Sequence, residues 1–260
     1  MRASYATPAI VLRARPFGES DRIVSFLTAN FGKVTGIAKG AMRSRKRFVN
    51  SLEPFALINL SFQDTSPSNL VFILTADLVL GYRHLASSLE RISHAAYLVE
   101  ITEGLIGERE ENIAIYQHLK DGLGYLEQHG TSLRFLTSFE LKLLRLVGYQ
   151  PVWENCKRCG DDRLARDADH WHFSLVEGGI LCDSCAHARR ESLPLSAKAV
   201  KILKTLQLEP DELPATVSLP FSVIAEMRLV MLRFIQFHVD REIKSARFLD
   251  QFSALPHSAT

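Results

Sequence analysis

The chain has 260 residues, of which 47% are hydrophobic and 23% are charged, and its formal net charge is +2. These proportions are those of an ordinary globular protein, and the length suffices for one large domain or two to three small ones. No segment approaches the ~20 uninterrupted apolar residues that a membrane helix needs, because even the run from Leu70 to Leu80 is interrupted by Asp77. The composition therefore argues against a membrane protein.

The charge is distributed unevenly along the chain. Residues 1–80 hold ten Lys or Arg against five Asp or Glu, a net of +5, whereas the rest holds 21 against 24, a net of −3. This asymmetry is typical of a polyanion-binding module attached to a nearly neutral scaffold.

The first 80 residues are predicted to form short strands. The expected strands, separated by turns rich in Gly, Pro, Asn and Asp, cover residues 9–15, 33–39, 55–62 and 70–74. Residues 22–27 fit a further strand or a short helix equally well. Four or five short strands in about 75 residues suit a small closed β-barrel of the OB-fold size.

Beyond Gly81 the pattern becomes helical. Apolar residues at three-and-four spacing predict helices over 87–106 and 113–127. One face of a third helix is lined by Leu136, Phe139, Leu143 and Val147. Helices resume at Ser196, a predicted N-cap, and at Ser222, after which residues 223–239 are apolar nearly all round and expected to be buried.

All four cysteines fall into two Cys-x2-Cys pairs, with 22 residues between the pairs. They are Cys156, Cys159, Cys182 and Cys185. Thiolates two residues apart reach one ion from a tight turn, and Gly160 supplies backbone freedom for such a turn. The spacing predicts one structural Zn²⁺ per chain, with every ligand position filled by sulfur and none left for catalysis.

Other roles for the cysteines are two disulfides, a redox pair or buried thiols without a ligand. Disulfides need an oxidising compartment, whereas residues 1–16 do not resemble a signal peptide, so we expect a cytosolic protein. A redox Cys-x-x-Cys opens a helix after a strand, whereas both pairs here lie in short polar stretches. His170, His172 and His187 lie nearby but are not expected to be ligands, because four thiolates suffice.

These patterns together predict an α+β multidomain protein with an N-terminal OB-fold barrel and an α-helical domain that contains an inserted four-cysteine zinc module. The module includes an expected hairpin over residues 171–182, turning at Gly178-Gly179. The expected divisions are the barrel at 1–80, the helical domain at 81–150 and 191–250, the zinc module at 151–190 and a C-terminal tail at 251–260.

A basic loop between two predicted strands places five cations in nine residues. They are Lys39, Arg43, Arg45, Lys46 and Arg47, and we expect them, with Arg13, Arg15, Arg22 and Lys33 of the barrel, to bind nucleic-acid phosphate. The alternative is a solvated loop that only aids solubility. Four phenylalanines interleave with the cations and are either base-stacking residues or core: Phe17, Phe26, Phe31 and Phe48.

Motifs of catalysis are missing. The sequence has no phosphate-binding P-loop, no dinucleotide fingerprint, no Gly-x-Ser-x-Gly elbow and no His-Glu-x-x-His. The acidic clusters at 108–111 and 161–162 fit solvated turns. We therefore expect no enzymatic activity.

Several segments resemble the family of the bacterial recombination mediator RecO. They are Phe17-Gly-Glu-Ser-Asp-Arg-Ile-Val24, Gly32-Lys-Val-x-x-Ile-Ala-Lys-Gly-Ala41, Leu52-Glu-Pro-Phe55, Phe139-Glu-Leu141, Gly148-Tyr149, the four cysteines and Ser245-Ala-Arg-Phe-Leu249. The resemblance covers nearly the whole chain in the same order and implies an OB-fold, a helical domain and, as in many members, a four-cysteine zinc module.

The resemblance also implies a function. The family binds single- and double-stranded DNA, anneals complementary strands, cooperates with RecR, engages the single-strand binding protein SSB and helps to load the recombinase RecA. For the C-terminal tail of SSB, the family points to the region 133–145, in which Arg134, Lys142 and Arg145 are the candidate contacts. A bacterial cytoplasmic, nucleoid-associated location is implied. An RNA-binding or ribosome-associated OB protein is the alternative, since the fold accepts either polymer.

Overall fold

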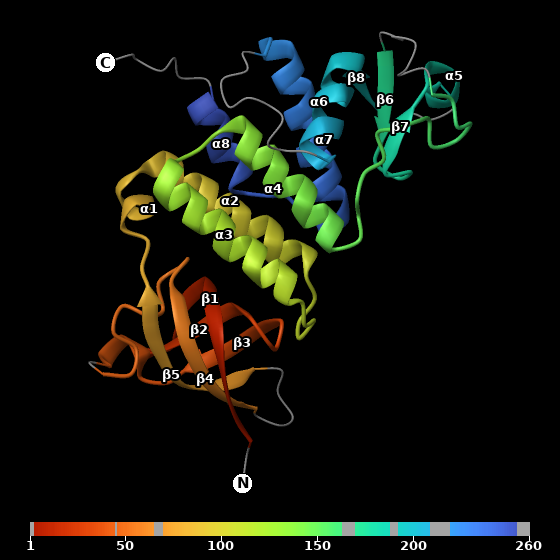
Figure 1. Cartoon of the computed structure of the whole chain (residues 1–260). Helices are drawn as coiled ribbons and strands as arrows, with labels where there is room; N and C mark the ends of the chain where they lie inside the picture. Colours follow the sequence, from red (N-terminus) through yellow and green to blue (C-terminus); the bar gives the residue numbers. More distant parts are fainter. Residues whose placement is uncertain are drawn as a thin grey trace, which may run out of the picture. The chain divides into compact units, whose positions relative to one another are not determined.

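The computed structural model describes residues 3–44, 46–64, 70–162, 170–187, 192–208 and 219–253, with the side chains of 250–253 excepted. Two compact units divide the chain: unit 1 comprises Met1–Gly130 and Ile243–Thr260, and unit 2 comprises Thr131–Glu242. The barrel and the first helices belong to unit 1, and the cysteine module belongs to unit 2 (Figure 1). The five-part division expected from the composition stays a prediction.

Five strands of unit 1 form a closed barrel in the order β1-β2-β3-β5-β4, drawn in red to orange in Figure 1. The strands are β1 (Ser4–Phe17), β2 (Asp21–Thr28), β3 (Lys33–Ala38), β4 (Leu57–Asp64) and β5 (Val71–Leu80). The predicted barrel is confirmed, and the ambiguous residues 22–27 lie in strand β2. Alternate side chains such as Val24 and Phe26 point inward and are fully buried, which is the period of two that a half-buried strand requires.

The barrel closes where β3 runs parallel to β5, through the pairs Gly36↔Val71 and Ile37↔Phe72. A Cβ atom at Gly36 would lie 2.6 Å from Cγ2 of Val71. Closure therefore depends on a glycine at this position, because any side chain would separate the two strands.

The helices of unit 1 are α1 (Arg83–Ser87), α2 (Leu89–Leu105), α3 (Ile113–His129) and α8 (Ala246–Ser253). Helices α2 and α3, which the sequence predicts, pack against each other (Figure 1). Ser88 caps α2 by accepting from the backbone N–H of Arg91, and Asn112 caps α3. The short helices α1 and α8 are not predicted. Glu100 of α2 accepts the backbone N–H groups of Lys244 and Ser245 immediately before α8, which attaches the C-terminal segment to this unit.

Unit 2 combines helices with a small sheet. Its elements are α4 (Leu133–Leu146), β6 (His170–Ser174), β7 (Gly179–Leu181), α5 (Asp183–Ala186), β8 (Ser192–Ser196), α6 (Ala197–Leu208) and α7 (Phe221–Val239). The predicted hairpin is confirmed by β6 and β7, but its turn covers residues 175–178, and Gly179 already pairs with Ser174. Strand β8 adds an unpredicted third strand beside β6. Ser196 caps α6 as predicted, by accepting from the backbone N–H of Ala199 at 3.3 Å.

One expectation for α7 is confirmed and one is wrong. The helix begins at Phe221, one residue before the predicted start at Ser222. The segment 223–239 is not buried all round, because Leu229 and Phe237 are exposed. The sequence did not reveal the solvent-exposed face of this helix, because that face also carries apolar residues.

A buried ion pair joins α4 to α7 within unit 2. Glu140 is completely buried, and Nη1 of Arg228 lies 2.8 Å from each of its carboxylate oxygens. Glu140, the acidic residue of the segment Phe139-Glu-Leu141, therefore helps to hold α4 against α7.

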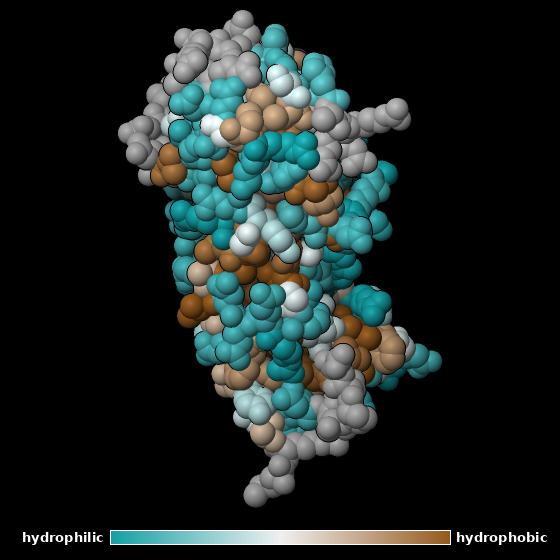
Figure 2. All heavy atoms as spheres, turned by 90° about the vertical axis from the view of Figure 1, so that its right-hand side faces the viewer, coloured by the Kyte–Doolittle hydropathy of each residue, from teal (hydrophilic) through white to brown (hydrophobic). Residues whose placement is uncertain are grey.

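None of the described helices is both long and apolar enough to cross a membrane. On the face drawn in Figure 2, hydrophilic residues in teal cover much of the described surface, and hydrophobic residues in brown form smaller areas between them.

Candidate functional site

The four cysteines come together at one end of the small sheet of unit 2. Their sulfur atoms all lie within 4.8 Å of one another, and the Sγ atoms of Cys159 and Cys182 are 3.7 Å apart. Zn–S bonds of 2.3 Å in a tetrahedron place sulfurs about 3.8 Å apart, so the donor set fits a tetrahedral ion of that size. The four cysteines can hold a metal ion, and no other such group of His, Cys, Asp or Glu occurs among the described residues.

Backbone hydrogen bonds build the two turns that present the sulfurs. In the first turn, Gly160 N donates to Cys156 O at 2.9 Å, and φ of Gly160 is 74°. In the second, the N–H of Cys185 donates to Cys182 O at 3.0 Å, at the start of α5. The N–H of Lys157 donates to Ile180 O of β7, which joins the first turn to the hairpin that carries the second. The sheet thus brings together two pairs that are distant in sequence.

The thiols influence one another's ionisation. Burial acts to raise the pKa of Cys156, but hydrogen bonds from the backbone at Cys159 and Cys182 outweigh burial and lower the pKa to about 6. Its neighbour Cys185 has its pKa raised to about 12, first by hydrogen bonding with the Cys182 side chain. The Cys156 thiolate forms readily whereas the Cys185 thiolate does not, so a bound cation would supply the attraction that ionises Cys185.

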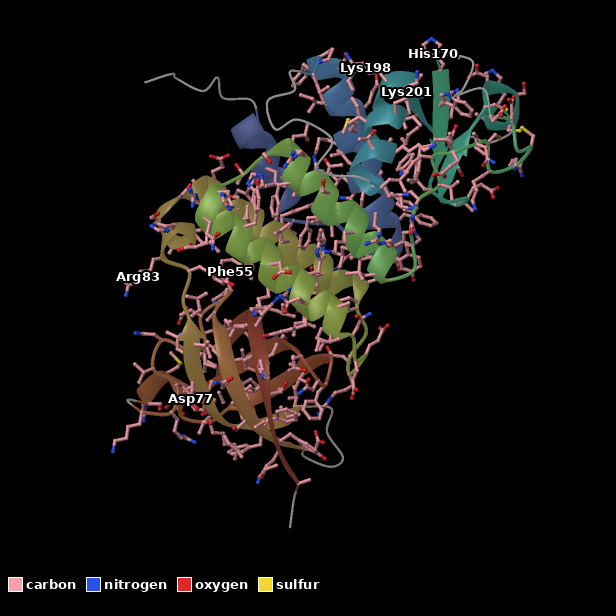
Figure 3. All side chains as sticks on the ribbon, in the orientation of Figure 1. Phe55, Asp77, Arg83, His170, Lys198 and Lys201 are labelled. Carbon is pink, nitrogen blue, oxygen red and sulfur yellow. The ribbon has the colours of Figure 1, made fainter. Side chains whose placement is uncertain are left out.

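None of the three nearby histidines belongs to the group that could hold a metal ion. Nε2 of His172 lies 2.9 Å from Oδ1 of Asp183, and the ring of His187 lies 6.4 Å from that of His172. His170 is exposed at the start of β6, where Figure 3 labels it.

The basic loop projects from the barrel between β3 and β4. Its described cations are all exposed: Lys39, Arg43, Lys46 and Arg47. Arg45 lies outside the described residues. Nη2 of Arg47 donates to Lys39 O at 2.9 Å, and its guanidinium lies 5.0 Å from the ring centre of Phe48. Arg47 therefore stabilises the loop as well as adding charge.

Hydrogen bonds anchor the backbone of this loop at both ends. It contains the short 3-10 helix η1 (Ala41–Arg43). The N–H of Gly40 donates to Oδ1 of Asp21 at 2.8 Å, and this hydrogen bond lowers the pKa of Asp21. Ala76 N donates to Arg47 O at 3.3 Å, which attaches the other end to β5. The cations are thus held on a defined surface of the barrel.

Three cations expected to bind phosphate already have partners within unit 1. Arg13 pairs with Glu103 of α2 at 2.8 Å, and Arg22 pairs with Glu53 at 2.9 Å. Nζ of Lys33 donates to the carbonyl oxygens of Glu103 and Ile106, and only 14% of the Lys33 side chain is exposed. Lys33 caps the C-terminal end of α2, which sequence patterns do not reveal.

Arg15 belongs to a different group. It is exposed near the end of β1, and the structure gives it no ion pair with any residue that it describes. Arg15 and the exposed loop cations are the barrel cations that remain accessible to an external anion.

The four interleaved phenylalanines separate by burial. Phe26 and Phe48 belong to the barrel core, with exposed fractions of 0% and 6%. Phe31 packs against the rings of Tyr5 and Phe62. Phe17 is 51% exposed.

The candidate partner surface on α4 does not include the apolar face of that helix. The apolar stripe packs into the interior of unit 2, since Leu136, Phe139 and Leu143 are each buried. Lys142 and Arg145 are exposed and Arg134 is half-buried. Their role in partner binding stays a prediction, resting on charge instead of on an exposed apolar stripe.

A cavity that the sequence does not reveal lies between the barrel and α2 in unit 1. Its volume is about 270 Å³, and its lining includes Leu12, Phe55, Val99 and Ser245. Phe55, labelled in Figure 3, adopts a φ of 73°, which is rare for a residue with a side chain. The segments Leu52-Glu-Pro-Phe55 and Ser245-Ala-Arg-Phe-Leu249 thus meet at one place in the fold.

Known protein families account for nearly the whole chain. A model described as Recombination protein O N terminal matches residues 1–82, and one described as Recombination protein O C terminal matches residues 86–247. The chain belongs to the RecO family. The resemblance inferred from the sequence motifs is confirmed.

Curated RecO relatives align along almost their full length. A DNA repair protein RecO of Anaeromyxobacter dehalogenans (strain 2CP-C) is 35% identical over 248 residues, covering 95% of this chain and 96% of the relative. That of Syntrophus aciditrophicus (strain SB) is 30% identical over 256 residues and covers 98% of both chains. That of Myxococcus xanthus (strain DK1622) is 31% identical over 247 residues, covering 95% of this chain and 97% of the relative. The chain is a DNA-repair protein of the RecO family.

Proposed function

We propose that this chain is a non-enzymatic recombination mediator that binds single- and double-stranded DNA and anneals complementary strands. The observation that carries the proposal is the group of exposed cations on the barrel of a RecO-family chain. They are Arg15, Lys39, Arg43, Lys46 and Arg47. Binding releases counterions from the phosphates, so affinity is insensitive to sequence and falls with salt.

Annealing follows from the same interaction. Two complementary strands repel each other through their phosphates, and cations that neutralise both strands make their collision productive. Base pairing then supplies the free energy, so no nucleotide hydrolysis is required. The proposed lack of catalysis is supported by the closed, four-sulfur character of the one metal-binding group among the described residues.

A direct test reverses the charge of the loop. The variant Arg43→Glu/Arg45→Glu/Lys46→Glu/Arg47→Glu should weaken binding to all DNA sequences alike. Each lost phosphate contact should lower the log–log salt slope by about 0.7 for single strands and about 0.9 for duplexes. A matched control is Arg83→Glu, an exposed cation of α1 labelled in Figure 3, which should leave the slope unchanged.

Wild-type affinity and slope in the quadruple variant would show that the loop only aids solubility. Repeating the salt series with an RNA strand of matched length tests the alternative of an RNA-binding OB protein. Stronger binding to RNA at every salt concentration would favour that alternative.

The metal is proposed to be one structural Zn²⁺ per chain, held by Cys156, Cys159, Cys182 and Cys185. Four sulfurs within 4.8 Å of one another, two of them 3.7 Å apart, favour zinc, and the free energy of binding would add to the free energy of folding. Metal analysis should find one zinc per chain, and Cys182→Ser should lose the metal and lower the unfolding temperature. Zinc-free protein with four free thiols and the same thermal stability would contradict this role.

The partners are proposed from family membership. In this proposal the chain acts with RecR to load RecA onto DNA that SSB coats, in the bacterial cytoplasm at the nucleoid. The acidic C-terminal tail of SSB would meet Lys142 and Arg145 on α4, with Arg134 at its N-terminal end. Titration of a labelled tail peptide against charge-reversed variants tests this, and unchanged affinity in all three would exclude α4.

A further inference from the structure

Two large apolar side chains stand exposed beside the cations of the barrel. Phe17, the last residue of β1, is 51% exposed, and Met42, within the 3-10 helix η1, is 52% exposed. Neither belongs to the barrel core, which is filled by inward-facing residues such as Val24, Phe26 and Phe62. The stability of the barrel therefore does not explain why these two positions carry large apolar side chains.

Hydrogen bonds hold the two segments that carry these side chains against each other. The N–H of Met42 donates to Ser20 O at 2.9 Å, and Ser20 lies in the turn that follows Phe17. The N–H of Gly40 donates to Oδ1 of Asp21, and Asp21 is the ladder partner of Phe17. Phe17 and Met42 thus occupy one small, fixed region of the surface.

Exposed cations flank both side chains. Arg15 precedes Phe17 by two residues, Arg43 follows Met42 directly, and Lys39 lies at the start of the same loop. The turn also carries an exposed Glu19, whereas the carboxylate of Asp21 is already engaged by Gly40 and Ser20. The region combines phosphate-binding charge with apolar surface.

We propose that Phe17 and Met42 contact the unpaired bases of a strand whose phosphates are held by Arg15, Lys39 and Arg43, so that this surface selects single strands over duplex. The inference rests on the proposed function and deepens it by naming the form of nucleic acid. An aromatic ring stacks on any base, and a thioether is a flexible, polarizable contact for a flat ring. In a duplex the base faces are stacked on one another, so these two side chains have nothing to contact there and only the cations bind.

The test compares the full-length variants Phe17→Ala and Met42→Ala with the wild type on three ligands at one salt concentration. The ligands are an oligothymidylate, an abasic strand with the same number of phosphates, and a duplex. Stacking on one base corresponds to about a 5- to 150-fold change in affinity, so Phe17→Ala should weaken oligothymidylate binding within that range. Met42→Ala should weaken it in the same direction, and both should leave the abasic strand and the duplex unaffected. Leu89→Ala is the matched control, because Leu89 is 67% exposed on α2 of the same unit.

A second measurement gives a direct signal of stacking. Both native tryptophans, Trp153 and Trp171, are fully buried, so the Phe17→Trp variant adds the one exposed indole. Its fluorescence should be quenched by oligothymidylate and not by the abasic strand. Unchanged oligothymidylate affinity in both alanine variants, equal losses for all three ligands, or no base-dependent quenching would overturn the inference. Absence of salt-dependent DNA binding by the wild type would instead overturn the proposed function.

Discussion

Lys33 offers a test of whether a cation of the barrel serves folding or DNA binding. Its ammonium group donates to Ile106 O at 3.1 Å and to Glu103 O at 3.3 Å, and it lies 3.5 Å from Oε1 of Glu108. Lys33→Met removes the charge and the donors but keeps a side chain of similar length. The last carbonyl groups of α2 then lose their partner.

The expected cost comes from two contributions. A hydrogen bond from a charged donor contributes about 1.5–3 kcal/mol, and a cation at a helix C-terminus contributes about 0.3–1 kcal/mol where it is exposed. These contributions overlap, because both describe the same ammonium group at the same carbonyls. We expect Lys33→Met to lower the free energy of unfolding by about 2 kcal/mol.

Urea unfolding followed by circular dichroism measures this loss, and a DNA salt series on the same variant measures any lost phosphate contact. The matched control is Arg15→Met, an exposed cation without an ion pair to any described residue. It should keep its stability and lower the single-strand salt slope by about 0.7. If Lys33→Met is as stable as the wild type and loses the same slope as Arg15→Met, Lys33 contacts DNA and the reasoning from its burial is wrong.

Two further changes test the packing of each unit. Arg228→Met should destabilise unit 2 by about 3–5 kcal/mol, because it removes the charged partner of the buried Glu140 carboxylate. The double variant with Glu140→Leu should recover most of that loss in chemical denaturation, and equal stability of the single and double variants would contradict the pairing. Gly32→Ala should lower the unfolding temperature more than Gly18→Ala. Both glycines have φ near 60°, so both substitutions strain the backbone, but only a Cβ atom at Gly32 would clash, because it would lie 2.2 Å from Glu110 O. Equal shifts in the two variants would show that the residues around Glu110 move aside at little cost.

The sequence by itself determined the features that depend on local chemistry. Alternating and three-and-four apolar spacing predicted the barrel strands and the helices α2, α3 and α4, because burial of one face imposes the period of the element. The four cysteines predicted a metal module, because the type of ligand and the spacing between ligands can both be read from the sequence. The family followed from motifs in order along nearly the whole chain.

Tertiary structure decided which side chains are free to act. Arg13, Arg15 and Lys33 are all basic residues of the barrel strands. Glu103 pairs with Arg13, the end of α2 engages Lys33, and Arg15 is exposed without an ion pair to any described residue. Phe17 and Phe26 cannot be distinguished by their sequence surroundings either. Only the closed barrel shows that Phe26 is in the core and Phe17 is exposed. A charge or a ring has the same local signature whether its partner is water, an acid or a carbonyl. The partner comes from a segment many residues away, so only the folded chain identifies it.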